Sequence, residues 1–153
     1  MGLIAMAKDD TRAAQGWLEQ SVAVRPSPEV LVDLAAALTR NWQLDKAVLC
    51  CRQALSVTPV SAEAHYNLGT ALHWMKDFQG AVGSLREAVR LNPDFFAARV
   101  NLGRSLLGAG QYAEAQREFE RVLAVNPTHA GALLFYGISC HEQGEFEKAV
   151  SYY

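Results

Sequence analysis

Between residues 62 and 95 the apolar side chains recur every three or four positions, along one stretch and then along a second. Such spacing places them on one face of an amphipathic α-helix. Because Lys76 and Asp77 separate the two stretches, we predict two helices joined by a short turn, which is a helical hairpin. The first stripe is His65, Leu68, Gly69 and Leu72, and the second is Phe78, Ala81, Leu85, Ala88 and Leu91.

The same hairpin pattern returns along the chain at an interval of 34 residues, which Pro59, Pro93 and Pro127 mark. A fixed period of this length is typical of stacked helical repeats, in which each unit packs only against its neighbours. The pattern therefore predicts an all-α solenoid of stacked antiparallel helix hairpins. Other residues keep the period as well: Leu68-Gly69 returns as Leu102-Gly103, and Ala81 returns as Ala115 and Ala149.

The period divides the 153 residues into units of one single array. We expect a partial unit at 1–27, three full units at 28–61, 62–95 and 96–129, and a truncated unit at 130–153.

The spacing between the first partial unit and the first full unit is less regular, because Pro26 lies 33 residues before Pro59 rather than 34. In this partial unit we interpret Gly2 and Ala5 as the tail of a first helix. A second helix is then expected over the stretch that holds Ala14, Leu18 and Val24.

Polar residues stand where each first helix should begin, and prolines stand where the second helices should end. Short polar side chains accept hydrogen bonds from the N–H groups of a first helical turn, whereas proline cannot continue a helix. We therefore predict N-caps at Ser27, Ser61, Asp94 and Thr128.

Two glycines, Gly69 and Gly103, occupy matched places in the middle of first helices. Glycine costs a helix interior up to about 1 kcal/mol relative to alanine. Its presence there predicts a close approach of the two helices of each hairpin, with Ala81, Ala115 and Ala149 as the opposing contacts.

These residues resemble the tetratricopeptide repeat family over essentially the whole chain. Two columns depart from the family pattern: Leu31, His65, Arg99 and Leu133 replace its tryptophan, and Leu38, Leu72, Leu106 and Cys140 replace its tyrosine. The resemblance is carried by Asn67-Leu68-Gly69, Ala81, Leu85, Ala88 and Pro93, and again by Asn101-Leu102-Gly103, Ala115, Phe119, Val122 and Pro127.

The resemblance implies a right-handed superhelix in which first helices line a concave groove that binds an extended peptide or a helix of a partner protein. The side chains expected on that groove lie on the first helices but off the packing stripes. They are Asp33, Ala36, Arg40, Tyr66, Asn67, Thr70, His73, Trp74, Asn101, Arg104, Ser105, Phe135, Ile138 and His141.

Asn67 and Asn101 are one period apart and resemble the asparagine ladder of O-linked N-acetylglucosamine transferase arrays, whose amides hold a peptide backbone. The interpretation that we favour slightly is that both residues are repeat consensus and serve the array itself. A carboxylate clamp is disfavoured, because Val32, Tyr66 and Val100 stand where such clamps need a lysine.

The three tryptophans, Trp17, Trp42 and Trp74, could anchor a partner, and Trp74 is the best placed. Packing at the turns is the interpretation that we favour for them. Cys50, Cys51 and Cys140 show no CxxC spacing, so we expect buried thiols, no disulfide framework and a reducing compartment, the cytoplasm.

No residue spacing in the sequence matches a metal site, a nucleophile elbow or a phosphate-binding loop, so we expect no cofactor, no metal and no catalysis by this segment. A net charge of −2 argues against nucleic-acid binding, and no apolar run is long enough for a membrane span.

Three hypotheses for function remain. The leading one is a protein-interaction scaffold with a protein or peptide ligand in the groove. The second is the substrate-presenting portion of a larger enzyme such as a glycosyltransferase. The third is self-association through the uncapped ends of the array.

Overall fold

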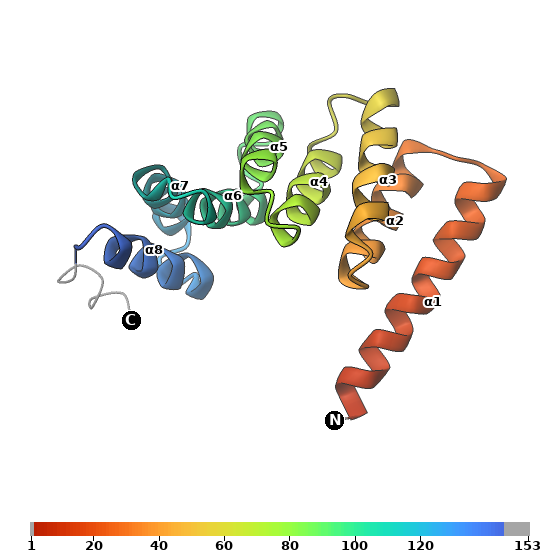
Figure 1. Ribbon diagram of the computed structural model, residues 1–153, viewed down its shortest axis with the longest axis horizontal. Coiled ribbons are helices and arrows are strands. Elements are labelled where there is room, and N and C mark those ends of the chain that lie inside the picture. The colour runs from red at the N-terminus through yellow and green to blue at the C-terminus, as the bar shows by residue number, and fades with distance from the viewer. Residues whose placement is uncertain (1, 146–153) are drawn as a thin grey trace.

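The computed structural model describes residues 2–145, and the side chains of residues 11–145 (Figure 1). This part of the chain consists of α-helices joined by short connections, which confirms the all-α prediction. The helices are α1 (Gly2–Val24), α2 (Pro28–Arg40), α3 (Leu44–Val57), α4 (Ala62–Trp74), α5 (Phe78–Leu91), α6 (Phe96–Gly108), α7 (Tyr112–Val125) and α8 (Ala130–Glu142).

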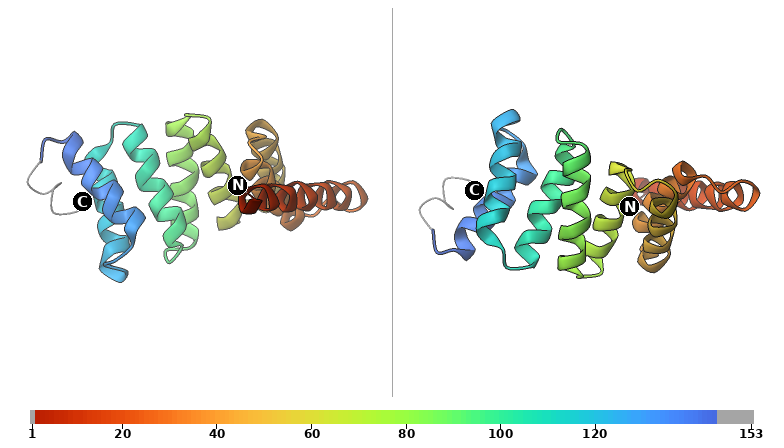
Figure 2. Two further views of the ribbon diagram at one scale, coloured as in Figure 1. Left: turned by 90° about the horizontal axis from the view of Figure 1, so that it is seen from below. Right: turned by 90° about the horizontal axis from the view of Figure 1, so that it is seen from above.

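The helices from α2 onward are stacked side by side along the long axis, and α1 extends from one end at an angle to them (Figure 2). Within residues 2–145 each first helix contacts the next one, α2 with α4, α4 with α6 and α6 with α8, whereas the second helices α3, α5 and α7 do not contact one another. The stack therefore curves with the first helices on its inner face, and we use that name for their shared surface.

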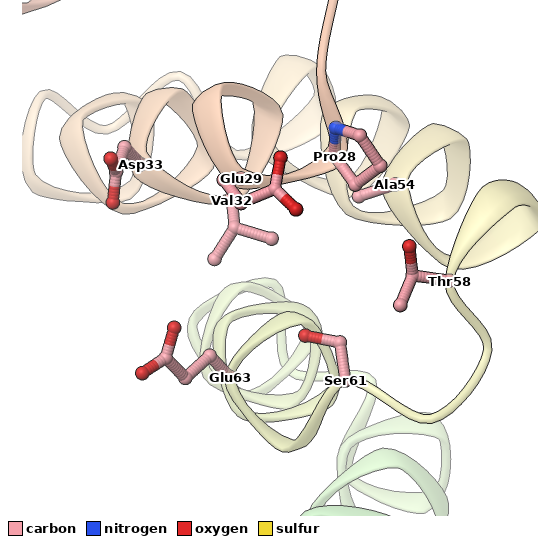
Figure 3. Close-up of a pocket in the computed structure, with 8 residues that line it drawn as sticks. All are labelled: Pro28, Glu29, Val32, Asp33, Ala54, Thr58, Ser61 and Glu63. Carbon is pink, nitrogen blue, oxygen red and sulfur yellow. The ribbon is translucent and has the colours of Figure 1, made fainter.

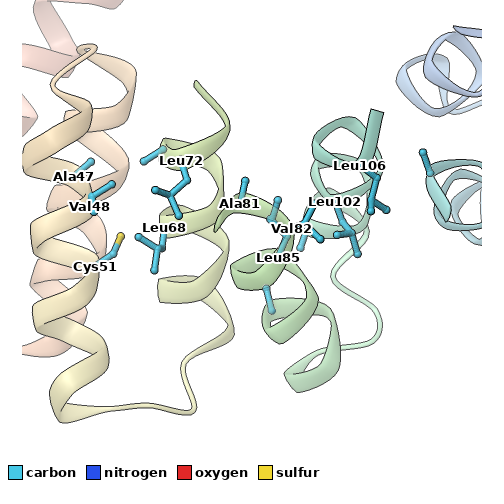
Figure 4. Packing of buried hydrophobic residues seen from close by; sticks show 14 of the residues in the cluster. Ala47, Val48, Cys51, Leu68, Leu72, Ala81, Val82, Leu85, Leu102 and Leu106 are labelled. Atoms are coloured by element: carbon cyan, nitrogen blue, oxygen red, sulfur yellow. The ribbon is translucent and has the colours of Figure 1, made fainter. Parts of the chain in front are cut away.

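One continuous core runs between the helices, and Figure 4 shows part of it from α3 to α6. Its largest fully buried side chains, Phe119, Leu38 and Leu85, stand on the predicted stripes. The interior column that the sequence marked at Leu38, Leu72, Leu106 and Cys140 is buried throughout. Within each hairpin the two helices bury their apolar faces against each other and against the next unit. The solenoid prediction is therefore confirmed.

The two helices of a hairpin approach closely at Gly69 and Gly103, as predicted. A Cβ atom added to Gly69 would lie 2.5 Å from Cγ of Leu85 and 3.1 Å from the carbonyl oxygen of Ala81. At Gly103 it would lie 2.5 Å from the ring of Phe119. The opposing side chain is thus one turn after Ala81 or Ala115; Ala149 lies outside the described residues.

The turn inside each hairpin places one residue in the left-handed backbone region, with φ values of 59° at Trp42, 65° at Lys76, 74° at Gly110 and 78° at Gly144. These four residues are one period apart. Only glycine adopts this conformation without a steric cost. Two of the four turns therefore keep a bulky residue where a glycine would relieve backbone strain.

The predicted N-caps are half right. Ser27 and Ser61 accept hydrogen bonds from the N–H groups of Val30 and Ala64. Asp94 and Thr128 are wrong, because the caps of α6 and α8 are Phe95 and His129, one residue later. In both loops the side chain of the preceding asparagine accepts from the backbone N–H of the expected cap, which fixes that residue in a turn: Asn92 for Asp94 and Asn126 for Thr128.

The N-terminal segment also differs from the prediction, because α1 is one continuous helix rather than two helices around a turn. No glycine or proline stands between Gly2 and Gly16. Lys8 has the place that corresponds to Trp42, one period earlier. The same place holds a lysine in the α4–α5 turn, where Lys76 is left-handed, so the residue type alone does not decide between a turn and a continuous helix.

The cysteines are free thiols. Cys51 and Cys140 are buried as predicted, whereas Cys50 is only partly buried. Burial raises the pKa of the Cys51 thiol to about 12, so the thiol stays protonated and unreactive at neutral pH.

Leu31, His65, Arg99 and Leu133 have the same place in successive repeats. The third of them, Arg99, forms a buried ion pair. Arg99 is 8% exposed; its Nη1 donates to Oε2 of Glu118 at 2.7 Å and its Nη2 to the Pro93 carbonyl oxygen at 2.8 Å. One unit earlier, Nε2 of His65 lies 3.1 Å from the Pro59 carbonyl oxygen, which only accepts, so Nε2 donates.

Replacing Gly69 by leucine should destabilise the array by about 3 kcal/mol, because the new side chain competes with Leu85 for the same space. Gly83 is the matched control, since it lies in α5 with no atom near its missing Cβ. Thermal and urea unfolding should show a large loss for Gly69→Leu and none for Gly83→Leu. Equal unfolding of Gly69→Leu and wild type would contradict the close crossing.

Glu118→Ala should lower the free energy of unfolding by about 3 kcal/mol, because it leaves the buried guanidinium of Arg99 without its counter-charge. Adding Arg99→Leu should recover most of that loss, since the matching residue of the first full repeat is the buried Leu31. Urea unfolding of the single and double variants measures both effects. A double variant that is less stable than Glu118→Ala would show that the pair does not act as described.

Candidate functional site

The inner face is hollowed between α2 and α4. Five predicted groove residues line this hollow of about 230 Å³ together with Thr39: Ala36, Arg40, Tyr66, Asn67 and Thr70. The hydroxyl of Thr70 donates to the Tyr66 carbonyl oxygen one turn back, which fixes its position. The ring of Tyr66 packs against Phe95 with 4.8 Å between the centroids.

The two asparagines of the inner face join neighbouring units. Nδ2 of Asn67 donates to the Val32 carbonyl oxygen at 3.1 Å, and Nδ2 of Asn101 donates to Oγ1 of Thr70 at 3.1 Å. Each bond crosses from one first helix to the preceding one. The amides therefore serve the array itself, as the favoured interpretation expected, and each still has a second N–H group.

Aromatic rings and one guanidinium form a line across four units. Cζ of Arg104 lies 5.4 Å from the ring centroid of Trp74 and 5.0 Å from that of Phe135. Trp74 in turn contacts Trp42 edge-on, at 5.3 Å between centroids. We call Trp42, Trp74, Arg104 and Phe135 the aromatic–arginine row.

Arg104 is held in the row by cation–π contacts and by a long hydrogen bond of 3.4 Å from its Nη1 to Oδ1 of Asn101. Partial burial lowers the pKa of its guanidinium, which nevertheless stays charged at any pH where the protein is folded. Among residues 11–145 Arg104 takes part in no ion pair. Its charge is therefore not neutralised by a neighbouring carboxylate.

His73 lies beside the row and connects it to the core. Its ring stands edge-on to Trp74 and to Phe78, at 5.5 Å from each centroid. Its Nδ1 is 3.0 Å from Oγ of Ser105. Burial lowers the pKa of His73, and the charge of Arg104 lowers it further, so the ring is neutral at physiological pH.

Asp33 lies apart from the residues above, in a second hollow of about 240 Å³ at the N-terminal ends of α2 and α4 (Figure 3). Glu29 and Glu63 also line it, so this hollow is acidic. His141 is at the end of α8, and its Nδ1 lies 3.7 Å from Oε1 of Glu142. Asp33 and His141, which were both predicted as groove residues, are therefore not members of the aromatic–arginine row.

Two predictions for individual residues are wrong. Ser105 is buried, because its hydroxyl donates to the Asn101 carbonyl oxygen inside the stack. The tryptophans do not pack inside the turns: Trp17 is 73%, Trp42 66% and Trp74 42% exposed. Trp42 was considered as an anchor but ranked below Trp74, although its place one period before Lys76 and two before Gly110 is a signal in the sequence.

The described residues hold no group of histidine, cysteine and carboxylate side chains suited to a metal ion. Nor does any helix within residues 2–145 have the length and apolar character needed to cross a membrane.

Comparison with family models gives the identity of the repeat. A model described as tetratricopeptide repeat matches residues 43–94 and 100–153, and a second with the same description matches residues 72–124. The chain belongs to the tetratricopeptide repeat family. The finer resemblance to O-linked N-acetylglucosamine transferase arrays stays a prediction.

Solved structures of other tetratricopeptide repeat arrays share the fold. A crystal structure of MamA is 24% identical with a TM-score of 0.84, and the match covers 99% of this chain and 90% of that one. MamA 41-end from Desulfovibrio magneticus RS-1 is 18% identical with a TM-score of 0.86, covering 98% and 85%. TTC0263, a thermophilic TPR protein in Thermus thermophilus, is 18% identical with a TM-score of 0.77, covering 99% and 84%.

At these identities the similarity concerns the fold alone. A search of curated proteins gives no match.

The neutral His73 predicts a pH dependence of stability. Its pKa in the folded chain is below the unfolded value of about 6.5. As the pH falls through the unfolded pKa, the unfolded chain takes up a proton that the folded chain resists, so stability decreases. His73→Asn keeps a nitrogen or oxygen near Ser105 without titrating, and should lose less stability than wild type between pH 7.5 and pH 5.5.

Urea unfolding at the two pH values measures this difference. Replacement of the exposed Gln53 by alanine removes no titrating group, is the control and should leave the pH dependence unchanged. An identical loss in wild type and His73→Asn would contradict the assigned role of His73.

Proposed function

We propose that this tetratricopeptide repeat array is a non-catalytic scaffold that binds an extended or helical segment of a partner protein along its inner face. The observation that carries the proposal is the continuity of that face. The hollow between α2 and α4 is followed by the aromatic–arginine row, which reaches α8. Arrays of this kind commonly use their concave surfaces to bind partners.

The amides offer groups for a bound backbone. Among residues 11–145 the second N–H of Asn67 and of Asn101 has no hydrogen-bond partner, and neither has Oδ1 of Asn67. An amide can donate to a peptide carbonyl and accept from a peptide N–H without reading a side chain. We infer a backbone contact at these two places, similar to the asparagine ladder of the transferase arrays.

The row offers anchors for side chains. Tryptophan and arginine are the residues most enriched at positions that dominate the free energy of protein–protein binding. Trp74 is 42% exposed, and its ring is held in place by Trp42 and Arg104. A side chain of the partner that packs on this fixed ring loses little of its binding free energy to ordering the site.

We also propose that the five expected units, with 1–27 and 130–153 as partial ones, form a single array. The free, largely buried thiols favour a reducing compartment, and we propose the cytoplasm.

Affinity capture followed by mass spectrometry tests the proposed function. Replacing Asn67, Trp74 and Arg104 together by alanine should reduce recovery of the partner at least about tenfold, because the variant removes both amide contact and anchors. The matched control replaces an amide, a large apolar residue and an arginine on second helices: Gln53, Leu49 and Arg117.

The control should recover the partner at the wild-type level, since these three residues are exposed away from the inner face. Circular dichroism and thermal unfolding confirm that both triple variants are folded. Loss of recovery in the control and not in the inner-face variant would place binding on the second helices.

A further inference from the structure

A hollow at the edge of the array lies where the end of α2 and the α2–α3 turn meet α1. It has a volume of about 230 Å³ and is lined by Arg12, Arg40, Asn41, Trp42 and Gln43. We call it the edge hollow. Arg40 borders both this hollow and the one on the inner face, so the two are neighbours without being the same site.

Amide side chains fix the walls of the edge hollow. Oε1 of Gln15, on α1, accepts from Nδ2 of Asn41 at 2.8 Å and from Nε2 of Gln43 at 3.1 Å. Nδ2 of Asn41 also donates to the Thr11 carbonyl oxygen. Gln15 is 9% exposed, and this partly buried network joins α1 to the turn. The hollow is therefore built by three segments rather than by loose surface side chains.

The charge of the edge hollow is positive. Arg12 and Arg40 both line it, and no carboxylate lines it among residues 11–145. Neither arginine takes part in the arginine–carboxylate pairs of this part of the chain, each of which includes a residue of α5 or α7. Two guanidinium groups at one hollow, with no carboxylate from residues 11–145 lining it, suit a negatively charged ligand.

The N-terminus of α3 lies beside the edge hollow; its first turn also carries Asp45, which does not line the hollow. Gln43 is the N-cap of α3, but its side chain makes no cap hydrogen bond, because its amide donates to Gln15 instead. The first N–H groups of a helix lack partners within the helix and carry a partial positive charge. Here they lie next to the side chains of the edge hollow.

Trp42 adds an apolar surface beside these charges. It is 66% exposed and keeps a φ of 59°, although the matched turn residues Gly110 and Gly144 are glycines. A glycine at this place would avoid the backbone strain. With Trp74 and Met75, each 42% exposed, it forms a patch in which the two indole rings contact each other.

We propose that the edge hollow binds an acidic segment of a partner protein. A carboxylate of the segment lies between Arg12 and Arg40 near the N-terminus of α3, and an adjacent large apolar side chain packs on Trp42 and Trp74. Complementary charge selects the segment, and the tryptophan pair supplies its anchor. The edge hollow shares Arg40 and the tryptophan pair with the inner-face site, whereas Arg12 lines the edge hollow alone and distinguishes the two.

Selection from a displayed library of random twelve-residue peptides tests the proposal on the whole 153-residue chain. Peptides that bind the wild-type chain are selected, and those that also bind the Trp42→Gly variant are then removed. The remaining peptides should carry aspartate or glutamate next to a large apolar residue. Synthetic copies should bind the Arg12→Gln/Arg40→Gln variant at least about tenfold more weakly than wild type, and their affinity should fall with added salt.

Two controls separate binding from folding and from the inner face. Trp42→Gly should unfold at the wild-type temperature or above, because glycine relieves the left-handed strain. Lower thermal stability of this variant would assign Trp42 to packing and overturn its role as an anchor. The Asn67→Ala/Asn101→Ala variant, which leaves Trp42, Trp74 and Arg104 in place, should bind the selected peptides with wild-type affinity.

The other outcomes overturn the inference. A selection that yields no peptide dependent on Trp42, or only Trp42-dependent peptides without acidic residues, contradicts an acidic ligand at the edge hollow. Peptides that depend only on Asn67 and Arg104 would support the proposed function while overturning this inference. Acidic peptides that need Arg12 and Trp42 but neither Asn67 nor Asn101 would support this inference alone.

Discussion

The close crossing of the two helices in each hairpin is the constraint on which the rest of this array depends. Leu85 and Phe119 occupy the space that a side chain at Gly69 or Gly103 would need, so only glycine allows the helices to come this near at these two crossings; the matching place in α2 is the small residue Ala35. Hairpins closed in this way stack through their first helices, while the second helices stay apart. The resulting curvature brings side chains of four units onto one surface.

The sequence was sufficient for the fold because a period, two stripes and matched glycines specify the same hairpin. Its failures were local. Asp94 and Thr128 looked like good caps by chemistry, but helix starts at 62, 96 and 130 obey the period, which points to Phe95 and His129. In α1 the turn was expected from the repeat, but a lysine at that place occurs both in the α4–α5 turn, as Lys76, and in the continuous helix α1, as Lys8.

The candidate site was less predictable than the fold. Position on a first helix was enough to find Arg40, Tyr66, Asn67 and Thr70, which share one hollow. The aromatic–arginine row was not foreseen as a unit, because Trp42 and Phe135 join it through contacts between residues about thirty positions apart. Such contacts depend on how successive units are rotated, which periodicity along the chain does not specify.

Polar side chains divide into two roles along the inner face. The amides of Gln15, Asn67 and Asn101 join one unit to the next, which makes the surface rigid. The guanidinium groups of Arg40 and Arg104 have no carboxylate partner among residues 11–145 and are left to interact with a ligand. Amide hydrogen exchange of the chain, alone and with its captured partner, tests this division most directly. Our account predicts slower exchange on binding in α2, α4 and α6; slower exchange confined to α3, α5 and α7 would contradict it.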